Sequence, residues 1–509
     1  MTDPDDDLNN SSIILDNSGS AFNLAKRIGF FAGPLGALLM ILGGYGFGVD
    51  GDGGISTPAL HTLALAWWMA CWWLTEAVPI AVTAILPIVL LPLLGISPIK
   101  AATAPYAHPL VFLFMGGFII GIAMQRHQLH RRIALHIVDR AGHSDVLLVG
   151  GVMLAAAFLS MWIMNTATCM MLLPIGIALI DYQQSRGVDG QQLRNFSLCL
   201  LLGIAYGATL GGVATLIGTA PNGFIAAFML ETYGLEISFL QWLQVGLPIS
   251  VLLLVATWLL LTQVVYPPRV KGGMGESGYI HSELESLGTM SGAEKIVAAV
   301  FVSAATLWVT RGTISDWFPA LQLTDAGIAM VCALALFLIP IEWRRGRFVL
   351  QWDDLKELPW GVLILFGGGL SLAAAVSDSG LSLWFGEQLV GLGNWPLSLL
   401  TFLVVGVVIL LTELSSNMAT TAILLPLIAA LAVANGYDPL LLAAPATVAA
   451  SCAFMLPVAT PPNAIVFGSG RITIPQMSRA GIWLNLVALV LVTLVVQWRV
   501  IQVFDLSVN

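Results

Sequence analysis

Long apolar runs separated by short polar segments follow one another from about residue 28 to residue 500. A helix needs roughly 20 apolar residues to cross the hydrocarbon core of a bilayer, so such runs predict membrane-spanning helices. The runs expected to span are 28–48, 60–74, 78–94, 110–124, 193–217, 243–265, 296–310, 325–341, 360–376, 441–468 and 481–500. This pattern predicts an all-α polytopic membrane protein with about eleven transmembrane helices.

Two further apolar runs, 146–180 and 397–434, do not fit a single crossing. Each is about twice as long as one crossing requires. Each carries its polar residues at its centre, "MNT" (164–166) in the first and "SSNM" (415–418) in the second. A spanning interpretation that leaves the flanks on opposite sides competes with a re-entrant hairpin whose flanks lie on one side.

The charge of the flanks favours the hairpins, because Lys and Arg gather in cytoplasmic segments. The segments on either side of the second run contain no Lys or Arg, so both should be external. The first run has basic flanks, which should both be cytoplasmic. Their basic residues are Arg126, Arg131, Arg132, Arg140, Arg186 and Arg194. We therefore predict two hairpins that enter the membrane from opposite faces.

The same rule orients the whole chain in a cell (inner) membrane. With the N-terminus inside, threading the spans in order leaves only Lys100, Arg311 and Arg499 among the basic residues outside. A bias of this size predicts a cytoplasmic N-terminus and an external C-terminus.

An internal repeat supports the two hairpins. Residues 109–142 resemble residues 359–393, each with a spanning helix that carries paired glycines, then an amphipathic stretch, then a hairpin. After each hairpin comes a long span interrupted by helix breakers, at 211–224 and at 454–470. Because the two halves have opposite orientation, they predict the inverted repeat of secondary transporters.

The composition excludes a soluble protein, with 58% hydrophobic and 10% charged residues. Residues 1–27 are acidic and polar and show no cleavable signal peptide, so we expect a disordered cytoplasmic tail. The five cysteines form no CxxC pair, which disfavours a disulfide framework or a zinc site. No HExxH, Walker A or Ser-His-Asp pattern supports an enzyme or an ATP-driven pump.

The interrupted spans carry the candidate chemistry. Gly218, Pro221 and the pair Pro461 and Pro462 should split each long span near the middle of the membrane. A split helix exposes carbonyl groups, which suit a sodium ion, and N–H groups, which suit a carboxylate. The breaks and the hairpin tips should meet, which would give Asn165 ligands as partners. No Lys or Arg lies near these segments, which favours co-binding of cations with an anion.

Two acids and three histidines need separate consideration. Glu76 and Glu413 lie at the edges of apolar runs, where either could relay a proton, although capping or tethering a helix is the favoured role. The histidines lie in the first amphipathic stretch, where one face of an interfacial helix is a better interpretation than a metal site. They are His127, His130 and His136.

With these motifs in place, the sequence resembles the divalent-anion:sodium symporter family, the INDY-type dicarboxylate carriers, from about residue 30 to residue 500. The motifs that carry the resemblance are "WWLTEAVPIAVTAILPIVLLPLLG", "SMWIMNTATCMMLLPIGIAL", "IGTAPN", "TELSSNMATTAILLP" and "ATPPN". The resemblance implies a homodimer in which a transport domain moves against a scaffold as an elevator, with the amphipathic stretches as hinge arms. It also implies two sodium ions beside one substrate.

The domain division that follows has five parts. They are the tail 1–27; scaffold helices and first arm, 28–142; the first half of the transport domain, 143–265, with hairpin 146–180 and broken helix 193–230; a cytoplasmic loop, scaffold helices and second arm, 266–393; and the second half of the transport domain, 394–509, with hairpin 397–434, broken helix 441–468 and the last helix.

The resemblance also implies site residues. The first sodium site would use Ser160, Met164, Asn165 and the carbonyl of Gly218, and the second Thr412, Ser415, Asn417 and the carbonyl of Ala459. The substrate carboxylates would meet Asn165, Thr166, Thr219, Ser416, Asn417, Thr460 and Pro461.

Two residues depart from the Ser-Asn-Thr that the family's hairpin tips typically carry. Met164 removes a hydroxyl beside the first sodium site, although a backbone carbonyl could replace it or Met164 could serve packing alone. Met418 removes a hydroxyl from the substrate pocket and adds apolar bulk, so the substrate could differ from succinate in length or symmetry.

The leading hypothesis is a carrier that imports C4-dicarboxylates such as succinate, malate or fumarate with sodium. The alternatives within this class are sulfate or a tricarboxylate as substrate, and proton-coupled or exchange transport. An anion-binding sensor or a channel is the alternative of another class. A sensor needs a soluble output domain, for which the longest loop, roughly 266–295, is too short. No nucleic-acid partner is expected.

Overall fold

The computed structural model describes residues 6–46, 49, 54–141, 144–188, 190–268, 278–389 and 395–506. The helices up to residue 259 are α1 (Asp6–Gly46), α2 (Thr57–Thr75), α3 (Ile80–Thr83), α4 (Leu86–Leu93), α5 (Ile99–Thr103), α6 (Pro109–Arg126), α7 (Leu129–Arg140), α8 (Asp145–Ser160), α9 (Asn165–Ser185), α10 (Gly190–Val213), α11 (Ala220–Tyr233) and α12 (Phe239–Leu259).

The remaining helices are α13 (Gly278–Ser286), α14 (Gly292–Trp317), α15 (Asp325–Leu338), α16 (Trp360–Asp378), α17 (Leu381–Leu389), α18 (Leu397–Thr412), α19 (Asn417–Ala434), α20 (Leu440–Ala450), α21 (Pro461–Phe467), α22 (Ile474–Leu491) and α23 (Gln497–Phe504). The described strands are β1 (Pro340–Glu342) and β2 (Arg347–Phe348), which pair antiparallel and are a small exception to the expected all-α fold.

Nine helical segments within the described ranges are long and apolar enough to cross a membrane, which confirms the expected polytopic helical class. Several predicted spans are built from shorter pieces. The run 78–94 divides into α3 and α4, because prolines stand at the start of each and cannot donate to a helical ladder. The Tyr106 hydroxyl donates to the Ala84 carbonyl that this division leaves free.

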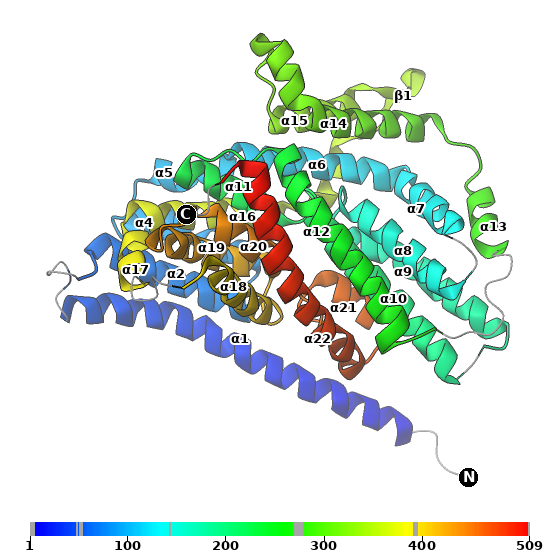
Figure 1. Cartoon of the computed structure of the whole chain (residues 1–509), viewed down its shortest axis with the longest axis horizontal. Helices are drawn as coiled ribbons and strands as arrows, with labels where there is room; N and C mark the ends of the chain where they lie inside the picture. The colour runs from blue at the N-terminus through cyan, green and yellow to red at the C-terminus, as the bar shows by residue number, and fades with distance from the viewer. Residues whose placement is uncertain are drawn as a thin grey trace.

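Helix α1 begins at Asp6, so it runs through most of the 1–27 segment that we expected to be disordered. Residues 1–5 lie outside the described residues. In Figure 1 α1 extends along the lower edge of the molecule, where it packs against α2.

Both predicted hairpins are present as pairs of helices with short tips. Helices α8 and α9 are joined by residues 161–164, and α18 and α19 by residues 413–416. In Figure 1 the first pair lies toward the right end of the long axis and the second toward the left. Each hairpin packs on the helix that follows it, α8 and α9 on α10, and α18 and α19 on α20.

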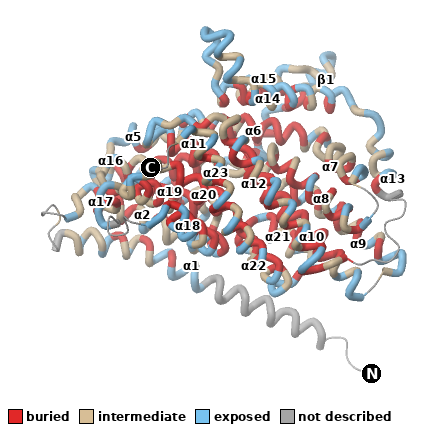
Figure 2. The backbone as a smooth tube through the Cα atoms, in the orientation of Figure 1, coloured by how far each residue is buried: buried red, intermediate tan, exposed pale blue. Residues whose placement is uncertain are grey.

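The most buried helices are the first parts of the two broken spans. Every residue of α10 from Phe196 to Val213 is buried, and so is every residue of α20. Figure 2 shows this buried centre enclosed by helices whose outer faces are exposed. The breaks at 214–219 and 451–460 therefore begin inside the protein, and the second reaches an exposed position at Val458, which is 68% exposed.

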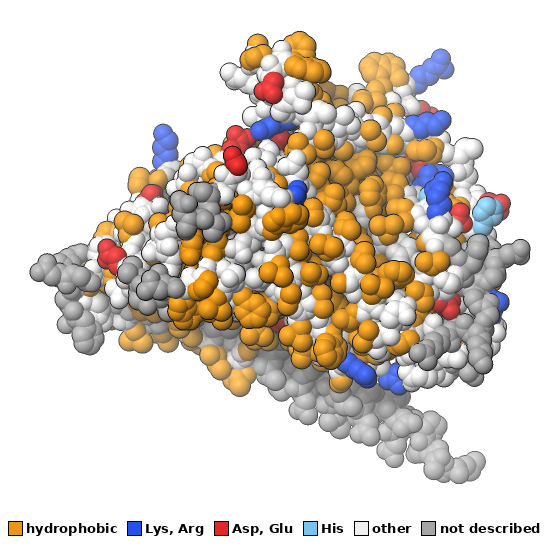
Figure 3. Space-filling view, in the orientation of Figure 1, with side chains coloured by type: hydrophobic (Ala, Val, Ile, Leu, Met, Phe, Trp, Pro, Cys, Tyr) orange, Lys and Arg blue, Asp and Glu red, His pale blue; other side chains and the backbone are white. Residues whose placement is uncertain are grey.

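The exposed surface is largely apolar, as a bilayer requires. Figure 3 shows hydrophobic side chains across the front of the molecule, with charged groups mainly toward its margins. Helices α14 and α15 project from the rest with β1, and both expose large side chains such as Val302 and Leu334.

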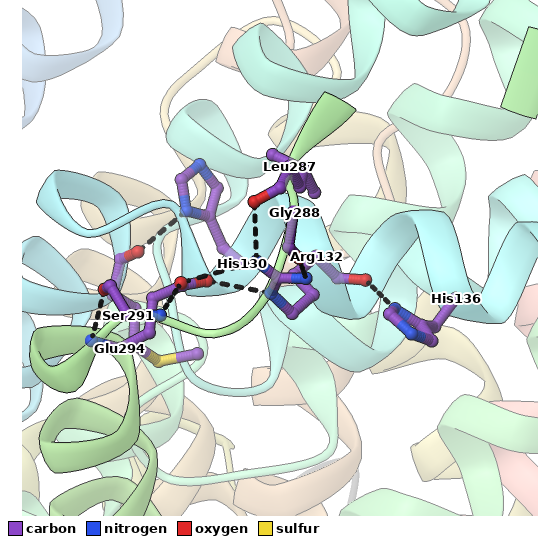
Figure 4. Close-up of polar contacts among 8 residues, drawn as sticks. His130, Arg132, His136, Leu287, Gly288, Ser291 and Glu294 are labelled. Carbon is purple, nitrogen blue, oxygen red and sulfur yellow. Dashed lines mark hydrogen bonds and ion pairs between the residues drawn. The ribbon is translucent and has the colours of Figure 1, made fainter. Parts of the chain in front are cut away.

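The first amphipathic stretch, α7, is attached to α14 and to the segment before it (Figure 4). The Arg132 guanidinium pairs with Glu294 at 2.9 Å and donates to the carbonyls of Leu287 and Gly288. Glu294 in turn accepts from the Ser291 backbone N–H at the start of α14. These contacts bind α7 to α14 as one unit.

The histidines of this region hydrogen-bond to backbone carbonyls. His127, His130 and His136 hydrogen-bond to the carbonyls of Val349, Met124 and Arg132 respectively. Burial lowers the pKa of His130. No cluster of three His, Cys, Asp or Glu side chains with metal-binding geometry occurs among the described residues.

Candidate functional site

The two helix breaks have the same local geometry. Thr219 precedes α11 with φ −145° and ψ 145°, and Thr460 precedes α21 with φ −142° and ψ 148°. A proline lies in the first turn of each helix, where its missing N–H costs nothing. Equivalent sequences therefore produce equivalent breaks in the two halves.

One asparagine holds each break in shape. The Asn222 side-chain nitrogen donates to the carbonyls of Gly212 and Thr215, ten and seven residues upstream. The Asn463 nitrogen donates to the carbonyls of Ala453 and Leu456 with the same two separations. Both asparagines are fully buried. This correspondence supports the internal repeat at the level of single hydrogen bonds.

The hairpin tips show a second correspondence. The Ser160 hydroxyl donates to Asn165 Oδ1 at 2.5 Å, and the Thr412 hydroxyl lies 2.9 Å from Asn417 Oδ1. Each pair is five residues apart and links the last residue of one hairpin helix to the first residue of the next. The Thr412 hydroxyl also lies 2.6 Å from the Ala450 carbonyl oxygen at the end of α20.

Oxygen atoms crowd around Asn165. Its Oδ1 lies 3.2 Å from the Gly218 carbonyl oxygen and 3.3 Å from the Ala208 carbonyl oxygen, neither of which can donate a proton. Turning the amide would let its nitrogen donate to both, whereas a cation among these oxygens would stabilise the present orientation. A Cβ on Gly212 would lie 2.6 Å from Asn165 Oδ1, so only glycine allows this approach.

The Glu413 side chain caps the second break. Its carboxylate accepts from the backbone N–H groups of Phe454, Met455 and Leu456 at 2.7 to 3.2 Å. It also accepts from the Asn485 side chain of α22 at 2.7 Å. These contacts are those of a cap and tether, the favoured prediction for this acid, because every donor exposed by the break at 454–456 is paired with it.

The hairpin tips and breaks surround a cavity of about 360 Å³. The first residues of α9, α11 and α19 all line it, so three helix N-termini face one space. Each helix N-terminus carries about half a positive charge. The residues that line the cavity are Glu76, Ile80, Phe118, Met164, Asn165, Thr166, Ile217, Gly218, Thr219, Ala220, Pro221, Val362, Ser416, Asn417, Met418, Pro457, Val458, Ala459, Thr460, Pro461, Pro462 and Ala464.

The structure brings together every residue expected to bind substrate. These residues line the cavity, and they are Asn165, Thr166, Thr219, Ser416, Asn417, Thr460 and Pro461. Of the expected sodium ligands, Gly218 and Ala459 also line it. Ser160 and Thr412 lie behind it, buried and bonded to the two tip asparagines.

Two expected sodium ligands have other contacts. The Ser415 hydroxyl donates to the Leu411 carbonyl and hydrogen-bonds to Thr420, so it is turned toward its own hairpin. When the pair Ser160 and Asn165 is aligned with the pair Thr412 and Asn417, Met164 is equivalent to Ser416 and not to Ser415. The Met164 carbonyl accepts the Thr168 N–H, and its side chain lines the site cavity and a small cavity beside α6.

Asn222 and Asn463 are the last residues of the motifs "IGTAPN" and "ATPPN", and neither was predicted to have a role. The repeated T-x-P-N spacing was the signal that could have identified them. Thr215, whose hydroxyl donates to the Met161 carbonyl and accepts the Gly218 N–H, had no such signal.

Comparison with known proteins shows what this chain is similar to. Residues 41–504 match the family model described as the sodium:sulfate symporter transmembrane region. The sodium-dependent dicarboxylate transporter SdcS of Staphylococcus aureus (strain USA300) is 42% identical over 494 residues, which cover 96% of this chain and 94% of SdcS. SdcS of strain NCTC 8325 is also 42% identical with the same coverage.

Two solved structures share the fold. The YdaH transporter of Alcanivorax borkumensis has a TM-score of 0.56 and 14% identity, covering 88% of this chain and 99% of its own. MtrF of Neisseria gonorrhoeae, described with a class of antimetabolite efflux pumps, has a TM-score of 0.52 and 14% identity, covering 80% and 84%. At this identity the two show the fold alone.

The family match and the relatives together confirm a transporter rather than an enzyme, and they confirm the resemblance seen in the motifs. The chain belongs to the sodium:sulfate symporter family of membrane transporters.

Proposed function

We propose that this protein imports a C4-dicarboxylate such as succinate, malate or fumarate together with sodium ions. The observation that carries the proposal is the cavity that three helix N-termini share with the hydroxyls of Thr166, Thr219 and Ser416. Such a cavity attracts an anion without a Lys or Arg. The 42% identity to SdcS, a sodium-dependent dicarboxylate transporter, supports both the substrate class and the cation.

Sodium would bind at the two asparagine tips. In the first half the oxygens are those of Ser160, Asn165 and the Gly218 carbonyl, which lie within 3.2 Å of Asn165 Oδ1. In the second half Thr412 and Asn417 form the matching pair. Neutral oxygens from side chains and unwound helices are the ligands that transporters use for sodium. A cation at each tip would also attract the carboxylates in the cavity.

The two tips place their hydroxyls differently. Thr166 follows the first tip asparagine, whereas the buried Met418 follows the second. Ser416 precedes the second tip asparagine where Met164 precedes the first, so the hydroxyl lies on a different side of the asparagine at each tip. A substrate with unequal ends, such as malate, fits this difference better than succinate.

We further propose an elevator mechanism in a homodimer. The hairpins and broken helices pack on one another, with α10 against α21 as well as against α8 and α9, which suits a single moving body. Helices α6, α14 and α15 pack together as a second body, to which Arg132 binds the arm α7. Glu76 and Val362, at the ends predicted to be cytoplasmic, line the cavity, so the described state is proposed to face inward.

Labelled anion uptake into vesicles that contain the purified protein tests the function. A panel of succinate, malate, fumarate, sulfate and citrate is supplied with a sodium gradient, with a proton gradient and with neither. Sodium-driven uptake of the C4 acids is expected. Uptake of sulfate or citrate alone would show that the proposed substrate is wrong. Uptake driven by protons without sodium would show that the proposed coupling ion is wrong.

A further inference from the structure

The cavity proposed to bind an anion is lined by an acidic side chain. Among the described residues that line it, Glu76 is the one with an ionisable side chain, and it is an acid in a cavity proposed for a dianion. Glu76 is exposed to solvent, and it also lines an adjoining cavity of about 250 Å³ with Lys26 and residues 77–80. A carboxylate at the open side of an anion site needs an explanation.

The backbone of Glu76 is held in an uncommon conformation. It ends α2 with φ 47° and ψ 40°, in the left-handed region that glycine and asparagine adopt most readily. Glutamate gains nothing from this conformation, so a residue chosen only to end the helix would be glycine or asparagine. An acid at this position, rather than glycine or asparagine, favours a role besides ending α2.

The position of Glu76 makes that role dependent on the state of the protein. Together with Ile80, Phe118 and Val362 it lines the cavity from helices outside the hairpins and broken helices. If those helices are the fixed body of the proposed elevator, the substrate faces Glu76 only when the cavity is open on this side.

We infer that Glu76 is an electrostatic release residue, which weakens dianion binding on the side of the membrane where it lines the cavity. This inference rests on the proposed function. Its carboxylate repels both charges of a dicarboxylate, and the repulsion is lost when the moving body carries the site to the other side. Repulsion of this kind changes affinity by about three- to tenfold and declines with ionic strength.

The test compares the native protein with Glu76→Asn, which removes the charge and suits the left-handed backbone, and with Glu76→Asp, which keeps the charge. The succinate concentration that gives half-maximal uptake is measured at saturating sodium in inverted and in right-side-out membrane vesicles. Each measurement is made at low and at high ionic strength, set with choline chloride. Glu387→Gln is the matched control, because it removes an exposed acid that lines a different cavity.

The expected result is a half-saturating succinate concentration about three- to tenfold lower for Glu76→Asn in inverted vesicles, where the cytoplasmic face is outside. The difference should shrink at high ionic strength and be absent in right-side-out vesicles, for Glu76→Asp and for Glu387→Gln. An equal change on both faces, no change, or a change in sodium affinity alone would overturn the inference. Native protein that fails to take up succinate, malate and fumarate would instead remove the proposed function.

Discussion

Glu413 and Asn485 are 72 residues apart in the chain, and the Asn485 side chain donates a 2.7 Å hydrogen bond to the Glu413 carboxylate. The bond joins the tip of the second hairpin to α22 beside the helix break. The same carboxylate accepts three backbone N–H groups of that break. Glu413 thus holds three segments that must stay together if the second half of the site is to keep its shape.

We expect Glu413→Gln to lower the free energy of unfolding by about 2–4 kcal/mol, because an amide NH2 would face backbone donors in a buried site. Thermal unfolding of the purified protein in detergent measures this, and uptake should fall in parallel. Glu387→Gln, which changes an exposed acid, is the control. A Glu413→Gln protein as stable as the native one would contradict the capping role.

Asn417→Ala should abolish uptake while the protein still inserts and folds. Asn417 bonds to Thr412 and lines the cavity, so one amide is proposed to serve both a sodium ion and the substrate. Losing such a group costs on the order of 1–3 kcal/mol per ligand, which is about fivefold to more than a hundredfold in affinity. Asn435→Ala, at the far end of the same helix, should transport normally. Near-normal uptake by Asn417→Ala would remove the central site assignment.

Met164→Ser should lower the sodium concentration needed for half-maximal uptake by several-fold. A thioether is a poor ligand for a hard cation, and the matching residue of the other tip is Ser416. One regained oxygen contact is worth about 1 kcal/mol. A sodium titration at saturating substrate that is the same for native protein and Met164→Ser would leave Met164 a packing role alone.

Cysteines placed at Ser185 and at Tyr437 should react from opposite faces of the membrane. Each lies just beyond one hairpin, and the flanks of the two hairpins differ in basic residues. Tyr437 is a better position than its neighbour Gly436, whose φ of 75° would strain any other residue. Impermeant reagents applied to oriented vesicles give the answer, and labelling from one face would refute the inverted hairpins.

The sequence by itself determined the helical membrane class, the two hairpins and the two breaks. These features depend on local properties: apolar runs of spanning length, prolines that cannot continue a helix, and polar residues at the centre of an apolar run. The same motifs located Asn165, Asn417 and the Thr-Pro pairs, all of which line one cavity. Repetition made the prediction strong, because the two halves carry the same pattern.

Only the tertiary structure decided which groups become partners. The family resemblance implied that Ser415 is a sodium ligand, yet its hydroxyl bonds to Thr420, whereas Ser416 lies at the cavity. Similarly, no local pattern reveals that Glu413 would meet Asn485 or that Asn222 would bind carbonyls seven and ten residues away. The physical reason is that a buried polar group must find a partner wherever packing brings one, and that position depends on how distant helices fit together rather than on neighbours in the chain.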